Sequence, residues 1–90
     1  MEDTSNIISP GIIIKDLIVR MHATREMFAF RLGIASEDMD RLIDGSLPLS
    51  RDIAFKLRDL TGIPGSYWLG VEKQFRHRLE KARQKQKTDR

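Results

Sequence analysis

The sequence has no cysteine among its 90 residues, which excludes disulfide bridges and thiolate metal sites. Its apolar runs, such as the isoleucines at positions 12–14, are far too short to cross a bilayer. The sequence begins with Met1 and two acidic residues, Glu2 and Asp3, and lacks the basic start of a signal peptide. We therefore expect a soluble, cytoplasmic chain with no membrane contact.

Signatures of catalysis are also missing. The sequence has no glycine-rich phosphate loop and no serine or cysteine nucleophile motif. Its two histidines, His22 and His77, have no third donor at a metal-ligand spacing. We expect no enzymatic activity, no metal site and no cofactor.

Charge is distributed unevenly along the chain. The formal net charge is +3, but residues 1–75 hold nine basic and eleven acidic side chains, a net charge of −2. Residues 76–90 hold seven basic and two acidic side chains, a net charge of +5. High basicity is typical of nucleic-acid binding, but here it belongs to the C-terminal tail.

Residues 24–45 have the pattern of two short helices joined by a tight turn. Gly33 can adopt the left-handed conformation that ends the first helix, and Gly45 ends the second. Such short helices are not stable alone, so we predict a helix-turn-helix packed against the rest of the chain. The expected core positions are Phe28, Ala29, Leu32, Ile34, Ala35, Met39, Leu42 and Ile43.

Three further helices are expected around this pair, over residues 10–21, over 51–60 and from residue 64 onward. Ser9, Thr24 and Ser50 are predicted N-caps, and Pro10 and Pro64 suit a first helical position. Their predicted core residues are Ile13, Ile14, Leu17, Ile18, Met21, Leu49, Ile53, Ala54, Leu57, Leu60, Tyr67, Trp68 and Val71. No segment has a strand pattern, so the predicted class is all-α, with frayed ends at residues 1–8 and 84–90.

Several motifs in this order resemble the HigA/VapI-type antitoxins, a branch of the XRE (Cro/cI-like) helix-turn-helix proteins. The motifs are Ser9-Pro10-Gly11, Thr24-Arg25-Glu26 followed by Phe28-Ala29 and Leu32-Gly33-Ile34, Arg41-Leu42-Ile43-Asp44-Gly45, and Tyr67-Trp68-Leu69. The resemblance covers residues 9–72 and implies a five-helix domain there, while the sequence itself predicts a disordered N-terminus (1–8) and a basic C-terminal helix extension or tail (73–90). The resemblance also implies a homodimer that neutralises a HigB/RelE-like mRNA-cleaving toxin and represses its own operon at a palindromic double-stranded DNA operator.

The resemblance makes residues 36–43 the recognition helix that enters the major groove. It places Thr24 and Arg25 at a phosphate, with Ser46 and Ser50 near the DNA backbone. The DNA-binding residues implied in this way are Thr24, Arg25, Ser36, Glu37, Asp40, Arg41, Ser46 and Ser50.

The acidity of this predicted helix departs from the family pattern. Glu37, Asp38, Asp40 and Asp44 stand against a single arginine, Arg41. One carboxylate can accept a hydrogen bond from cytosine N4, but phosphates repel the others. Either Arg25, Arg41, Arg51 and the basic tail supply the attraction, or the chain is an antitoxin-like protein-interaction module that binds DNA weakly. A phage-type regulator without a toxin is a third alternative.

Simpler structural roles are also open for these residues. Arg41 is spaced to pair with Glu37 along the helix, and Glu37 and Asp40 can belong to a merely solvated face. Tyr67 and Trp68 are expected as core anchors. Phe30, Leu47 and Phe75 are candidates for an exposed dimer or partner patch.

Overall fold

The chain folds into five α-helices in a computed structural model that describes residues 8–88, with side chains described as far as Arg83. The helices are α1 (Pro10–Arg20), α2 (Arg25–Leu32), α3 (Ser36–Asp44), α4 (Arg51–Thr61) and α5 (Gly65–Thr88). No strand occurs within the described range, which confirms the predicted all-α class. None of the described helices is both long and apolar enough to cross a membrane.

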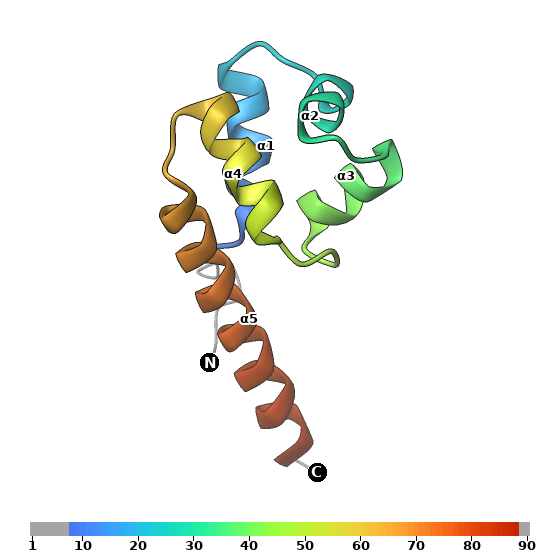
Figure 1. Cartoon of the computed structure of the whole chain (residues 1–90). Coiled ribbons are helices and arrows are strands. Elements are labelled where there is room, and N and C mark those ends of the chain that lie inside the picture. Colours follow the sequence, from blue (N-terminus) through green and yellow to red (C-terminus); the bar gives the residue numbers. More distant parts are fainter. Residues whose placement is uncertain (1–7, 89–90) are drawn as a thin grey trace.

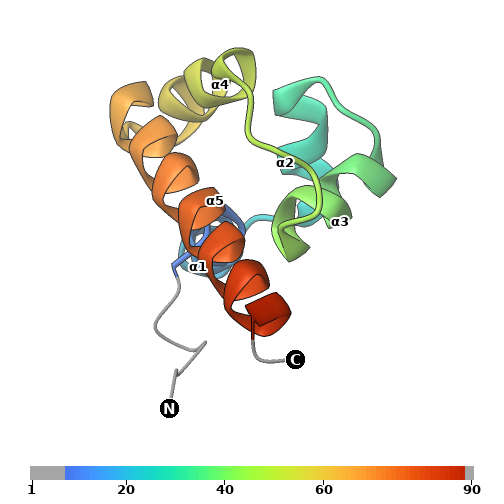
Figure 2. The same cartoon turned by 90° about the horizontal axis from the view of Figure 1, so that it is seen from below.

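The helices form a closed ring around the core. Going around it, α1 contacts α3, α3 contacts α2, α2 contacts α4, α4 contacts α5, and α5 returns to α1. Figure 2 shows this ring from below. The second half of α5 projects beyond the other helices (Figure 1) and contributes to overall dimensions of 44 × 23 × 22 Å.

Three helices begin with the predicted side-chain caps. The hydroxyl oxygens of Ser9, Thr24 and Ser50 accept hydrogen bonds from backbone N–H groups three residues later, at 3.2, 3.0 and 3.2 Å. Each cap satisfies a donor that has no partner within its helix. By contrast, α3 begins after Ala35, which has no side chain that can accept such a bond.

The start of α5 corrects one prediction. Pro64 precedes the helix, which begins at Gly65, and does not occupy its first position. Its carbonyl oxygen accepts hydrogen bonds from the backbone N–H groups of Tyr67 and Trp68, at 3.1 and 3.3 Å. The helix then continues as far as Thr88, so the fraying expected from residue 84 is not seen in its backbone. The expectations for residues 1–7 and 89–90 lie outside the described residues.

The core contains most of the predicted apolar positions. Its buried members are Ile14, Ile18, Phe28, Ala29, Leu32, Met39, Leu42, Leu49, Ile53, Ala54, Leu57 and Trp68. Ile13, Leu17, Ile34, Ile43 and Leu60 are half-buried and pack against it, and Val71 is also half-buried.

Three predicted core residues are exposed instead. Met21 is the C-cap of α1, so its side chain no longer follows the apolar stripe of that helix. Ala35 precedes α3 and does not share its buried face. Tyr67 is half exposed because its neighbour Trp68, about 100° further around the helix, takes the buried position.

A close helix crossing joins α1 to α3 through a glycine. A Cβ atom at Gly11 would lie 2.0 Å from the carbonyl oxygen of Ile43. Any side chain at residue 11 would therefore push the two backbones apart. This contact fixes the last turn of α3 against α1.

A second glycine contact joins α3 to α5. Gly45 ends α3 with a φ of +91°, a conformation that L side chains rarely adopt. A Cβ atom there would lie 3.0 Å from the Phe75 ring, which is buried against this turn. Of the predicted patch of Phe30, Leu47 and Phe75, only Phe30 is exposed, at 83%; the patch is wrong because Phe75 is buried and Leu47 packs half-buried on the core.

Candidate nucleic-acid interface

The α2–α3 pair has a helix-turn-helix arrangement held by local hydrogen bonds. Gly33 ends α2 in the left-handed conformation, and the backbone N–H of Ile34 donates to the carbonyl of Ala29 at 3.0 Å. The ammonium group of Lys56 on α4 donates to the carbonyl of Leu32 at 3.4 Å. These contacts set the turn between the two helices and tie it to α4.

Burial of one side of α3 determines which side faces solvent. Met39 is 1% exposed, Leu42 is 2% exposed, and Ile43 is half-buried. The opposite side therefore points outward, as the sequence predicts. Its exposed residues are Ser36, Glu37, Asp40, Arg41 and Asp44, while Asp38 is half-buried at the flank. That these side chains contact DNA stays a prediction.

An ion pair links the start of α2 to this outer face. The Nη1 of Arg25 donates to the Oδ1 of Asp40 at 2.6 Å, and both side chains are 57% exposed. Two residues predicted to contact DNA are thus brought together, fifteen positions apart in sequence. The charge that would attract a phosphate is already next to a carboxylate.

Arg41, the single arginine of α3, is also paired, although with a different partner from the one its spacing suggests. Its Nη1 lies 3.3 Å from the Oδ1 of Asp38, three residues earlier. The expected pairing with Glu37 is wrong, because spacings of three and four residues both bring side chains together on a helix and Asp38 is the one within reach. Both arginines of the candidate interface therefore lie beside acids of α3.

The C-terminal end of α3 carries a carboxylate that stays charged. The backbone N–H of Ser46 donates to the Oδ1 of Asp44 at 2.9 Å. This bond, together with a side-chain hydrogen bond from Ser46 and the charge of Arg41, holds the pKa of Asp44 below its usual value. The Ser46 hydroxyl also lies within 3.4 Å of the Arg41 carbonyl. Asp44 is therefore ionised at neutral pH, and the outer face keeps its negative charge.

The remaining predicted site residues serve as helix caps in the free chain. Thr24 caps α2 and Ser50 caps α4 through their hydroxyl oxygens. A capping hydroxyl still has its own O–H to donate, so a cap and a phosphate contact are compatible at each position. Thr24 lies beside Arg25 at the start of α2, whereas Ser50 belongs to the separate start of α4.

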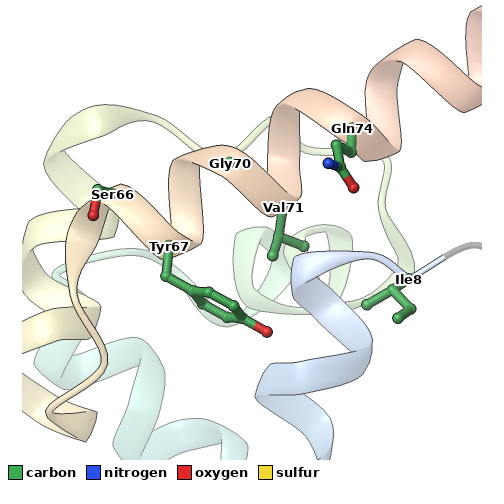
Figure 3. Close-up of a pocket in the computed structure, with 6 residues that line it drawn as sticks. All are labelled: Ile8, Ser66, Tyr67, Gly70, Val71 and Gln74. Atoms are coloured by element: carbon green, nitrogen blue, oxygen red, sulfur yellow. The ribbon is translucent and has the colours of Figure 1, made fainter.

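A concave surface, which the sequence did not reveal, lies between α5 and the start of α1. It is a shallow groove of about 370 Å³, lined by Ile8, Ser66, Tyr67, Gly70, Val71 and Gln74. Figure 3 shows the Tyr67 and Val71 side chains directed from α5 toward α1, with Ile8 at the far end. The groove forms where two helices that are distant in sequence come together, so no local sequence pattern predicts it.

Comparisons with known proteins place the fold. No family model and no curated protein matches the sequence. A candidate antidote protein of a plasmid maintenance system from Nostoc punctiforme superposes with a TM-score of 0.83 at 23% identity, covering 91% of this chain and 90% of that one. An addiction module antidote protein of a HigA family from Coxiella burnetii superposes with a TM-score of 0.76 at 19% identity, covering 92% and 91%.

A third structure, a hypothetical protein from E. coli, superposes over a smaller part of the chain. Its TM-score is 0.67 at 19% identity, covering 73% of this chain and 68% of that one. At these identities the similarity concerns the fold. The chain thus shares the all-α fold of these two antidote proteins over about nine-tenths of its length.

Proposed function

We propose that the chain is the antitoxin of a type II toxin–antitoxin system and also represses its own operon as a DNA-binding dimer. The observation that carries the proposal is the outward face of α3, which the burial of Met39 and Leu42 presents to solvent within an antidote-type fold. The proposed partners are a palindromic double-stranded operator, a HigB/RelE-like toxin and a second copy of the chain. The activity is regulatory, and no catalytic step is assigned.

The size and position of α3 suit the major groove of DNA. The major groove admits one α-helix, whose N-terminal and outward residues contact base edges. In α3 these residues are Ser36, Glu37, Asp40 and Arg41. In a dimer, two copies of α3 about 34 Å apart would enter successive major grooves on one side of the duplex.

The charges on the outward face of α3 make DNA binding depend on the DNA sequence. Arg41 can donate two hydrogen bonds to a guanine, and Glu37 or Asp40 can accept one from cytosine. On other sequences the same carboxylates face phosphates or unmatched base edges and are repelled. We therefore expect weak binding to arbitrary DNA and a larger contribution from base contacts than in a basic recognition helix.

The test is binding to the DNA upstream of the gene. Fluorescence anisotropy should detect salt-dependent binding to a palindrome there and weaker binding to a scrambled duplex. Arg41→Ala should weaken operator binding by about 1–3 kcal/mol. Arg20→Ala is the matched control, because Arg20 lies on α1 in an exposed pair with Asp16. Absence of binding, or binding that is unchanged in both Glu37→Ala and Arg41→Ala, contradicts the proposal.

A second function is an antitoxin-like module that binds a partner protein without binding DNA. The pairing of Arg25 with Asp40 and of Arg41 with Asp38 favours it, because both cations of the surface are partly neutralised. Co-expression with the product of the adjacent reading frame separates the two functions. A stable complex together with no operator binding, even at low salt, supports the module.

A further inference from the structure

The ion pair between Arg25 and Asp40 differs from every other one in the described part of the chain. The other pairs lie within one helix, at spacings of one, three or four residues. The pair of Arg25 and Asp40 alone joins two helices, the start of α2 and the outer face of α3. From this geometry we propose that Asp40 is a specificity-determining residue, which holds Arg25 and competes with DNA phosphate for it. The inference rests on the proposed DNA-binding function.

Arg25 occupies the position that a phosphate would approach. It is the first residue of α2 and follows the N-cap Thr24. Backbone N–H groups and the helix dipole favour an anion at such an end, and an arginine there adds a second attraction. In the free chain the guanidinium of Arg25 instead holds the carboxylate of Asp40, 2.6 Å away.

The pair is exposed enough to exchange partners. Both side chains are 57% exposed, and ion pairs in water contribute little to stability because solvent screens the attraction. A DNA phosphate can therefore replace Asp40 at Arg25. The replacement leaves an uncompensated carboxylate at the protein–DNA boundary, and this unfavourable step is the same for every sequence.

Only some sequences compensate for the released carboxylate. An ionised carboxylate accepts hydrogen bonds and donates none, so it needs a base-edge donor such as the N4 amino group of cytosine. Where the duplex presents that donor, Asp40 exchanges one partner for another. Where it does not, Asp40 faces acceptors or phosphates and opposes binding. Asp40 thus lowers the affinity for arbitrary DNA more than the affinity for a matching site.

The test compares Asp40→Asn with Asp16→Asn in the full chain. Asp16 is the matched control because its carboxylate also lies 2.6 Å from an exposed arginine, Arg20, but on α1. Anisotropy is measured against the upstream duplex and a scrambled duplex over a series of KCl concentrations. Asp40→Asn should bind the scrambled duplex about three- to tenfold more tightly, with a salt slope steeper by about one. The upstream duplex should gain less, and Asp16→Asn should change neither.

A double variant tests whether Asp40 acts through Arg25. In an Arg25→Gln background, Asp40→Asn should lose most of its gain, because the cation it releases is absent. The inference is overturned if Asp40→Asn binds the scrambled duplex no more tightly than the parent chain. It is also overturned if the gain is undiminished in the Arg25→Gln background.

Failure of the proposed function gives a different result. A parent chain that binds the upstream and scrambled duplexes equally contradicts operator recognition. The comparison of the parent chain with Asp40→Asn on the scrambled duplex still decides whether Asp40 restrains Arg25, because it does not require the parent chain to prefer one DNA sequence. If neither the parent chain nor Asp40→Asn binds any duplex at low salt, both the function and the inference fail.

Discussion

The two sides of α3 show how one short helix can separate folding from recognition. On the inner side, Met39 and Leu42 are buried and the Ile43 backbone lies directly against Gly11. On the outer side, Glu37 and Arg41 are exposed, and Arg41 pairs with Asp38 in a contact that solvent screens. Inner substitutions should therefore change stability, whereas outer substitutions should change binding.

The largest effect is expected at the crossing of α1 and α3. Gly11→Ala places a methyl group 2.0 Å from the Ile43 carbonyl oxygen, and both sides of this contact are backbone. We expect a loss of about 4 kcal/mol or more in the free energy of unfolding. Urea denaturation followed by circular dichroism, at fixed protein concentration, measures it.

Gly70→Ala is the control for that substitution. Gly70 lies within α5, and a Cβ atom there meets nothing within 4 Å. Because alanine is the better helix former, this variant should gain about 0.5–1 kcal/mol. A Gly11→Ala protein as stable as Gly70→Ala would contradict the close crossing of α1 and α3.

The next largest effect on the free energy of unfolding is expected from substitutions on the inner side of α3, compared with its outer side. Leu42→Ala removes a side chain that is 2% exposed and leaves a cavity, so it should cost about 2–5 kcal/mol. Glu37→Ala on the outer side should change stability by no more than about 0.5 kcal/mol. Equal losses measured by thermal unfolding would mean that the two sides are not distinct.

Helix capping gives a smaller effect with opposite signs on α2 and α3. Thr24→Ala removes the acceptor of the Met27 N–H, 3.0 Å away, and should cost about 1 kcal/mol. Ala35→Ser adds a cap where α3 has none and should gain about 0.5 kcal/mol or more. Chemical denaturation of both variants measures the difference, and a loss in Ala35→Ser would show that the start of α3 is satisfied in another way.

The smallest effect is the pH dependence contributed by Asp44. Its pKa is lower in the folded chain than in the unfolded chain, chiefly because the Ser46 backbone N–H donates to it. A lowered carboxyl pKa stabilises the fold above the unfolded pKa, near pH 4, and this contribution is lost as the pH falls through the folded pKa. Carboxyl NMR titration should give a low midpoint for Asp44. Ser46→Ala keeps the backbone donor and should leave most of the shift in place, whereas a full return to the ordinary value would assign the shift to the hydroxyl.

Local patterns predicted the elements of the fold well. The spacing of Phe28, Met39 and Leu42 identified the buried faces of α2 and α3, because helical periodicity acts over a few residues. The serine and threonine caps and the glycine stops were predicted for the same reason. The outward direction of the predicted site residues on α3 followed from its buried face.

Contacts between distant segments were not predictable in this way. The Arg25–Asp40 pair, the fit of Gly11 against Ile43 and the groove beside Tyr67 each require two helices to be placed relative to one another. The exposure of side chains near helix ends also differed from the prediction, because each residue along a helix is turned by about 100° from the one before it. This accounts for Ala35, which precedes its helix and does not extend its apolar stripe.

The ring of Phe75 beneath Gly45 has a consequence for how α5 is anchored. Beyond this contact α5 extends for thirteen more residues to Thr88, roughly 20 Å at about 1.5 Å per residue. Gly45 has neither the space nor the backbone conformation for a larger residue. The base of this extension and the end of α3 therefore share one point of contact, and a substitution at Gly45 would disturb both.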